Sequence, residues 1–300
     1  MAHCEVIDGF PAFLGFWDQV RQEPTDRQVE GWATQYMSHW PELLVKQQED
    51  YASQNVDWRQ IARERVFPFL DERLPAMTRA HAYLVDAVAP LYTAAQGALG
   101  FQSEAVFVLY VGIGCGAGWV TTLGGLPAIL YGLENIAECG WLEAEALDGL
   151  VAHETGHLAH AWWREQAGKG EGSGPFWQLY SEGFAQRCEH LILGQDTWHQ
   201  STGLNGPGWL DWCHDHKGCL AAEFLSLAET QDQAAVRPFF GSWYDIRGWK
   251  ECGYYLGHEV VRELETGLSL QQIGLLDDID DRMRRLLEGM VSRVPPAGEA

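Results

Sequence analysis

The stretch between Glu104 and Glu134 contains no charged residue, and it limits the folds open to this chain more than any other feature. An uncharged run of this length meets the length requirement of a membrane-spanning helix. Pro127 and many glycines interrupt it, however, and these residues break helices. Between the interruptions, residues 105–111, 119–123 and 128–133 form apolar runs of the kind found in strands. The sequence therefore predicts a small buried sheet of about three strands.

Glycine occupies every second position from Gly112 to Gly118, between the first two predicted strands. Such glycine-rich runs occur in phosphate-binding loops, where backbone amides approach a ligand closely. A phosphate loop leads directly into a helix, and no helical pattern follows Gly118. We therefore interpret this run as a hairpin turn.

Apolar residues recur at steps of three and four from about Phe10 to Leu99, which is the spacing of amphipathic helices. Pro24, Pro68 and Pro75 punctuate this helical region. The sequence thus predicts several helices before the strands. In chain order, the expected organisation is an N-terminal helical subdomain at residues 1–103, a second domain at residues 104–294 and a frayed tail at residues 295–300.

The chain is strongly acidic, because 42 acidic and 20 basic residues give it a formal net charge of −22. This charge repels phosphate backbones and anionic lipid headgroups, so we expect no nucleic acid and no membrane as a partner. No Lys or Arg precedes Arg21, so the charged beginning of a signal peptide is not recognised. Seven cysteines without regular spacing fit reduced thiols, and we expect a cytoplasmic protein.

Two histidines four residues apart enclose a glutamate in the segment His153-Glu154-x-x-His157. On a helix, residues i and i+4 lie on one face, so both imidazoles can bind one ion. In this H-E-x-x-H pattern Glu154 faces a water on that ion. A catalytic zinc site has three protein ligands and one open position, so one further ligand is expected elsewhere. The helix that carries the motif is predicted to begin near Leu142.

A second helix is predicted to begin at Pro175, and it contains the sequence Glu182-Gly-Phe-Ala. Together with H-E-x-x-H, this sequence resembles the gluzincin zinc metallopeptidases, in which a glutamate on a second helix is the third zinc ligand. The resemblance covers roughly residues 105–270, and the layout is most similar to the compact predicted zinc-dependent proteases of that clan. It implies a zinc ion held by His153, His157 and Glu182. It also implies an α+β, mostly helical fold, with a small β-sheet packed on a zincin-like (gluzincin-like) helical catalytic domain.

The same resemblance implies hydrolysis of a peptide substrate by a zinc-activated water, with Glu154 as the general base. A further helix, predicted at residues 248–264, carries Tyr254 and His258 four residues apart and therefore on one face. Tyr254 matches the transition-state tyrosine of the family, and His258 is a candidate second donor. Tyr255 points about 100° away and is the alternative to Tyr254.

Three further expectations concern the surroundings of this site. Glu189 lies seven residues after Glu182, where it either fixes a ligand imidazole or is a solvated surface acid. The strand at residues 128–133 is expected to be an edge strand that pairs with an extended substrate, as in gluzincins. Glu134 lies in a Gly-x-Glu-Asn sequence that resembles the aminopeptidase segment whose glutamate binds a free amino terminus. If it does so here, the enzyme is an exopeptidase.

Other interpretations remain open. The segment from Cys213 to Cys219 contains two histidines and can be read as a second metal site or as an ordinary polar helix. The zinc scaffold can also act on a non-peptide amide or a specialised small molecule. A non-catalytic zinc-binding protein is the third alternative, although metal retention alone does not need Glu154. The substrate, the cleavage preference and the oligomeric state do not follow from the sequence.

Overall fold

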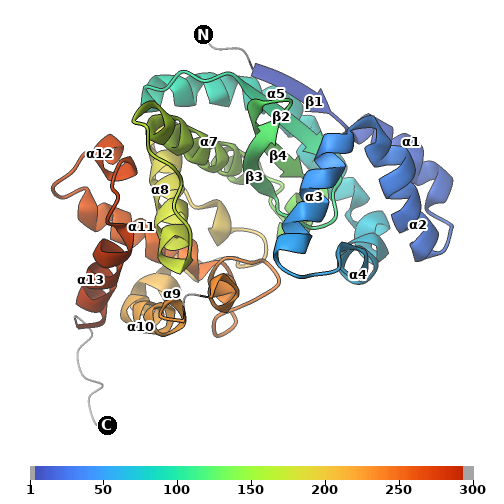
Figure 1. Cartoon of the computed structure of the whole chain (residues 1–300). Helices are drawn as coiled ribbons and strands as arrows, with labels where there is room; N and C mark the ends of the chain where they lie inside the picture. The colour runs from blue at the N-terminus through green and yellow to red at the C-terminus, as the bar shows by residue number, and fades with distance from the viewer. Residues whose placement is uncertain (1–3, 231, 293–300) are drawn as a thin grey trace. The chain divides into compact units, whose positions relative to one another are not determined.

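Figure 1 shows the computed structural model, which describes residues 4–230 and 232–292. The chain forms two compact units, Met1–Glu154 and Thr155–Ala300. The division falls inside helix α7 (Ala144–Gln166), which continues from the first unit into the second. The expected tail at residues 295–300 lies outside the described residues.

The N-terminal part of the first unit is helical, as the apolar periodicity predicts. Its helices are α1 (Phe10–Val20), α2 (Thr25–Gly31), α3 (Pro41–Ser53), α4 (Trp58–Ile61) and α5 (Leu70–Leu99), with short π and 3₁₀ turns η1 (Trp32–Tyr36), η2 (Met37–His39), η3 (Ala62–Val66) and η4 (Phe67–Phe69). Pro24 directly precedes α2 and Pro68 lies in η4, whereas Pro75 lies inside α5. An internal proline removes only one helical hydrogen bond, and the buried face of α5, including Met77 and Leu84, offsets this loss.

Four strands form one mixed sheet in the order β1-β2-β4-β3. They are β1 (Cys4–Asp8), β2 (Ala105–Tyr110), β3 (Gly118–Leu123) and β4 (Leu126–Gly132). β2 is parallel to both β1 and β4, and β3 is antiparallel to β4. The three strands predicted from sequence are therefore confirmed, and β1 is a fourth that the apolar pattern did not reveal. With its sheet and many helices, the protein has a mostly helical α+β fold.

The strand order corrects two expectations about the sheet. β4 pairs with β2 on one side and with β3 on the other, so residues 128–133 do not form an edge strand. The strand at that edge is β3 instead. Because β2 and β3 both pair with β4, the run from Gly112 to Gly118 is a loop that crosses between nonadjacent strands, not a hairpin turn. The hairpin turn lies at Gly124 and Gly125, whose φ angles are 59° and 79°.

The remaining helices follow the sheet along the chain. They are α6 (Leu133–Cys139), α7, α8 (Pro175–Leu193), η5 (His199–Ser201), α9 (Trp209–Asp215), α10 (Lys217–Ala228), η6 (Gln233–Phe239), α11 (Cys252–Leu264), α12 (Leu270–Gly274) and α13 (Ile279–Ser292). α11 begins four residues later than Gly248, because Ile246 and Trp249 form a β-bridge. None of the helices in the described part of the chain is long and apolar enough to cross a membrane.

Candidate metal centre

Helices α7 and α8 approach each other closely at Gly156, which lies between the two histidines of the motif. A Cβ atom at this position would lie 2.7 Å from the Cβ atom of Cys188 and 3.2 Å from the Cα atom of Ala185. Packed carbon atoms prefer about 3.5–4.0 Å, so a side chain here would force the helices apart. Glycine at this position therefore brings the turn that carries His157 against α8.

On another face, α8 packs equally closely against α11. A Cβ atom at Gly183 would overlap the carbonyl group of Gly257, and one at Gly257 would overlap the carbonyl oxygen of Leu179. Glycine at position 257 thus allows the two helices to approach each other closely. Gly253 packs instead against Phe240, in the segment before α11. Contacts on two faces fix the rotation of α8, and this rotation determines where Glu182 points.

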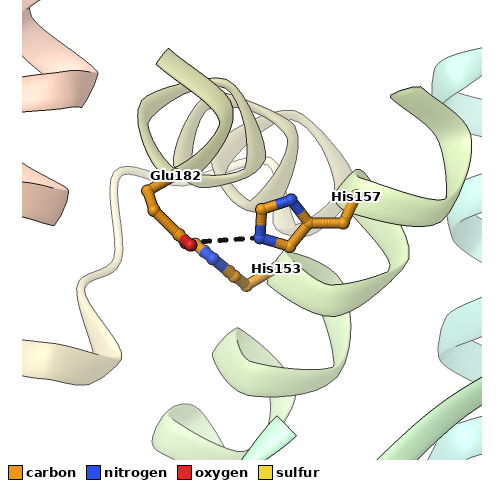
Figure 2. A group of neighbouring side chains, drawn as sticks. All are labelled: His153, His157 and Glu182. Atoms are coloured by element: carbon orange, nitrogen blue, oxygen red, sulfur yellow. Dashed lines mark hydrogen bonds and ion pairs between the residues drawn. The ribbon is translucent and has the colours of Figure 1, made fainter. Parts of the chain in front are cut away.

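His153, His157 and Glu182 are brought together, as Figure 2 shows. One potential ligand atom from each of the three lies within 4.8 Å of the others. The Nε2 atom of His157 lies 3.3 Å from the Oε2 atom of Glu182. Two atoms bound about 2.0–2.1 Å from a tetrahedral ion are about 3.3 Å apart, so this separation fits zinc ligands. Two imidazole nitrogens and one carboxylate oxygen are also a donor set that zinc prefers.

Ser181 contacts the other nitrogen of the His157 ring. Its Oγ atom lies 3.2 Å from His157 Nδ1. When His157 Nε2 binds a metal, Nδ1 carries the proton and donates it in a hydrogen bond to this hydroxyl oxygen. The sequence analysis did not identify Ser181, and its place directly before Glu182 is the only signal that the sequence contains.

Glu189 and His199 form a second buried pair beside the ligands. Glu189 is fully buried, so the surface-acid alternative is wrong. Its Oε2 atom lies 2.9 Å from Nδ1 of His199, a residue of η5 that the sequence analysis missed. Burial lowers the pKa of His199 to about 3, although the nearby charge of Glu182 opposes this shift. Potential ligand atoms of His153, Glu189 and His199 also lie within 4.8 Å of one another, and a role of Glu189 in fixing His153 stays a prediction.

The side chain of Glu154 lies against β3 and is only 7% exposed. A Cβ atom at Gly118, the first residue of β3, would lie 2.6 Å from Glu154 Cγ and 2.7 Å from its Oε1 atom. The carboxylate therefore occupies space that is open only because residue 118 is glycine. This contact places the expected general base at one end of the edge strand.

Glu134 lies in the first turn of α6 and is fully buried. Its Oε2 atom accepts a hydrogen bond of 2.7 Å from the backbone N–H of Gly112, and its Oε1 atom accepts one of 3.1 Å from Gly114. Burial raises the pKa of Glu134 to about 7, and the two backbone hydrogen bonds oppose this shift. The side chain is fully buried and both oxygens accept hydrogen bonds from the chain's own backbone, which argues against the expected binding of a substrate amino terminus by this residue.

The three aromatic side chains predicted on α11 have different surroundings. Tyr254 is partly exposed and its ring packs edge-on against Phe240, with 5.8 Å between the ring centres. Tyr255 is buried against tryptophan rings, and His258 is buried between His190 and Trp198. Burial lowers the pKa of His258, which favours the neutral imidazole. The catalytic roles of Tyr254 and His258 stay predictions.

The segment from Cys213 to Cys219 is not one of the groups with metal-binding geometry in residues 4–230 and 232–292. Cys213 is buried and Cys219 is exposed. The two thiols thus lie in different environments, which fits the alternative of ordinary helical residues.

Comparisons with protein-family models, with curated proteins and with solved structures find no match for this chain. An inference about function therefore depends on the site itself. It rests on the potential ligand atoms of His153, His157 and Glu182, which lie on α7 and α8, and on the Glu154 carboxylate.

Proposed function

We propose that this protein is a zinc-dependent hydrolase of peptide bonds, in which His153, His157 and Glu182 hold the metal. The proposal is carried by the proximity of two imidazole nitrogens and one carboxylate oxygen within 4.8 Å of one another. Three protein ligands leave a fourth position for water or substrate, as catalytic zinc sites require. Bound zinc would supply Lewis acidity, which lowers the pKa of its water to about 7 and polarises a carbonyl group.

Glu154 is the general base in this proposal. Its carboxylate takes a proton from the attacking water and returns it to the leaving amine. The position of this carboxylate against Gly118 supports the role, because it lies where the edge strand begins. An extended peptide that pairs with β3 through main-chain hydrogen bonds would bring a peptide bond to that end. β3 thus takes the place of residues 128–133 as the expected substrate strand.

Tyr254 is proposed to donate a hydrogen bond to the oxyanion that forms during attack. It is the most exposed of the three side chains predicted on α11, since Tyr255 and His258 are 3% exposed. A positioned donor of this kind contributes several kcal/mol in other hydrolases. The second donor, His258, is packed between aromatic rings and would need to act from that buried position.

The first experiment combines zinc analysis with cleavage of a mixed peptide library by the whole chain. We expect bound zinc and peptide cleavage in the wild type. In Glu154→Gln we expect unchanged zinc content and no turnover, because the amide keeps the shape of the side chain but cannot accept the proton. Glu165→Gln is the matched control, since Glu165 is exposed on the same helix, and it should keep wild-type activity.

The other outcomes separate the alternatives. Loss of zinc in Glu154→Gln would make Glu154 a ligand and contradict its role as a base. Full zinc content in Glu182→Ala would move the third ligand elsewhere, with Glu189 the next choice. Zinc binding without cleavage of any peptide would favour a non-peptide substrate, and a wild-type chain without zinc affinity would end the proposal.

A further inference from the structure

The loop from Val111 to Ala117 connects β2 to β3. It crosses to a strand that is not the neighbour of β2, so its amide groups need partners outside the ladder. Glu134 supplies two of them, because one carboxylate oxygen accepts from Gly112 and the other from Gly114. A carboxylate in a fully buried position is costly unless it is hydrogen-bonded in this way. The two hydrogen bonds therefore fix the loop at Gly112 and Gly114, and the Tyr51 hydroxyl holds it between them by donating a hydrogen bond to the carbonyl oxygen of Ile113.

Contacts hold the loop at both of its ends. A Cβ atom at Gly112 would lie 2.7 Å from Glu134 Oε1 and 2.8 Å from a ring carbon of Tyr110. Near the other end, the backbone N–H of Gly132 donates a hydrogen bond of 3.1 Å to the carbonyl oxygen of Ala117. The loop is thus bound by the Glu134 carboxylate near its start and by the last residue of β4 at its end.

The loop, held in this way, places Gly118 next to the side chain of Glu154. A Cβ atom at Gly118 would lie 2.6–2.8 Å from three atoms of the Glu154 side chain, including its carboxylate carbon. The position of the Gly118 backbone consequently limits where this carboxylate can lie. Glu134, the loop, Gly118 and Glu154 all belong to the first unit of the chain.

From these contacts we infer that Glu134 is a positioning residue for the general base, and that it acts through the loop 111–117 and the backbone of Gly118. The inference rests on the proposed function, because it needs Glu154 to act as a base. Glu134 touches no substrate in this account. It holds the loop in the path that leaves one position open for the Glu154 carboxylate. A purely structural role would predict that Glu134 affects stability and leaves turnover by the folded protein unchanged.

Gly118→Ala tests the last contact in this series, between residue 118 and the Glu154 side chain. The new methyl group meets the flexible end of the Glu154 side chain, so the carboxylate should move while the fold and the metal ligands remain. We expect unchanged zinc content, an unchanged KM and a kcat about 100-fold lower, since a displacement of about 1 Å can cost this much. A crystal structure of the variant should show the carboxylate displaced. Gly97→Ala is the control, because an added Cβ atom there meets nothing within 4 Å, and its kinetics should match the wild type.

Glu134→Gln tests the first step. The glutamine amide has one acceptor oxygen, so one of the two loop amides loses its partner. We expect hydrogen exchange at Gly112 or Gly114 to become at least about tenfold faster. We also expect kcat to fall about tenfold or more at unchanged KM and zinc content, because a loosened loop places Gly118 less accurately. Faster exchange with wild-type kcat would contradict the inference and leave Glu134 a structural role only.

Failure of this inference can be distinguished from failure of the proposed function. If the wild-type chain cleaves no peptide, the proposed function fails. The hydrogen-exchange rates of Gly112 and Gly114 and the position of Glu154 in a crystal structure still test whether Glu134 and Gly118 position the Glu154 carboxylate. An unmoved Glu154 carboxylate in Gly118→Ala would overturn the inference whether or not the enzyme is active. Wild-type kcat in Gly118→Ala with a displaced carboxylate would overturn the positioning role itself.

Discussion

The imidazole of His157 is held from both of its ring nitrogens. Nε2 faces Glu182 at 3.3 Å, and Nδ1 faces the Ser181 hydroxyl at 3.2 Å. A hydrogen bond to the distal nitrogen orients a metal-binding histidine and raises its basicity. Adjacent residues of α8 thus provide one expected ligand and one partner that orients another ligand.

We expect Ser181→Ala to bind zinc about 10–100-fold more weakly, because it removes the acceptor for His157 Nδ1–H. Competition with a chromogenic chelator measures this affinity. The control is Ser38→Ala, because the Ser38 hydroxyl is exposed and donates a hydrogen bond to the carbonyl oxygen of Gln35. Equal zinc affinity in Ser181→Ala and the wild type would show that another group orients His157.

Tyr254 and Tyr255 provide a second test at the level of single atoms. We expect Tyr254→Phe to lower kcat by about ten- to a thousand-fold with zinc content and folding intact. Tyr255 is 3% exposed, and its hydroxyl has no hydrogen-bond partner among the described residues. We therefore expect Tyr255→Phe to keep wild-type kcat and to change the free energy of unfolding by less than about 1 kcal/mol. The reverse pattern in steady-state kinetics would assign the oxyanion donor to Tyr255.

Part of the site follows from sequence because its chemistry depends on local spacing. His153, His157 and Glu154 are linked by the geometry of one helix, which the sequence specifies. Ser181 and His199 are different, because their contacts depend on the rotation of α8 and on the path of the chain after it. No local pattern encodes either. The burial of Glu134 is not predictable from local sequence either, since its hydrogen-bond partners are amides 20 and 22 residues earlier in the chain.

At the scale of elements, the position of Glu182 depends on how closely α8 approaches its neighbours. Gly183 meets the backbone of Gly257, so neither helix has a flexible side chain at the crossing that could move aside. Small residues at such a crossing allow the helix axes to approach, and any added atom must separate them.

We expect Gly183→Ala to lower the free energy of unfolding by about 1–3 kcal/mol or more and to weaken zinc binding, because α8 must shift and carry Glu182 with it. Urea unfolding and zinc titration measure the two effects. Gly289→Ala is the control, since its added Cβ atom meets nothing within 4 Å in helix α13, and it should be neutral or slightly stabilising. A Gly183→Ala protein as stable as the wild type would mean that the crossing is looser than described.

Most elements could be predicted, but their pairing could not. The apolar runs located β2, β3 and β4 to within a few residues, because strand composition is a local property. β1 is short and contains two acidic residues, and its partner β2 lies about a hundred positions away in the chain, with Cys4 opposite Ala105. The order that makes β3 the edge strand also depends on such pairing. Local patterns carry no information about it.

At the scale of the whole molecule, the buried carboxyl groups of Glu134 and Glu251 make the free energy of unfolding depend on pH. Burial raises the pKa of Glu134 to about 7 and that of Glu251 to about 8, from an ordinary value of 4.5. Between the ordinary and the raised values, the folded state binds protons that the unfolded state has released. The contribution of each group to the free energy of unfolding is therefore complete below about pH 4.5 and is lost as the pH rises through the raised pKa.

We expect the free energy of unfolding to fall between pH 5 and pH 8, with a limit of about 1.4 kcal/mol per pH unit for each group. The net charge of −22 adds general repulsion in the same direction, so a matched variant is needed to isolate one group. Glu251→Gln mimics the neutral acid and lies away from the proposed metal ligands in sequence. It should unfold like the wild type at pH 5 and resist unfolding better at pH 8, as measured by urea titration at both values. If the free energies of unfolding of the two proteins differ by the same amount at pH 5 and at pH 8, Glu251 does not titrate between these pH values.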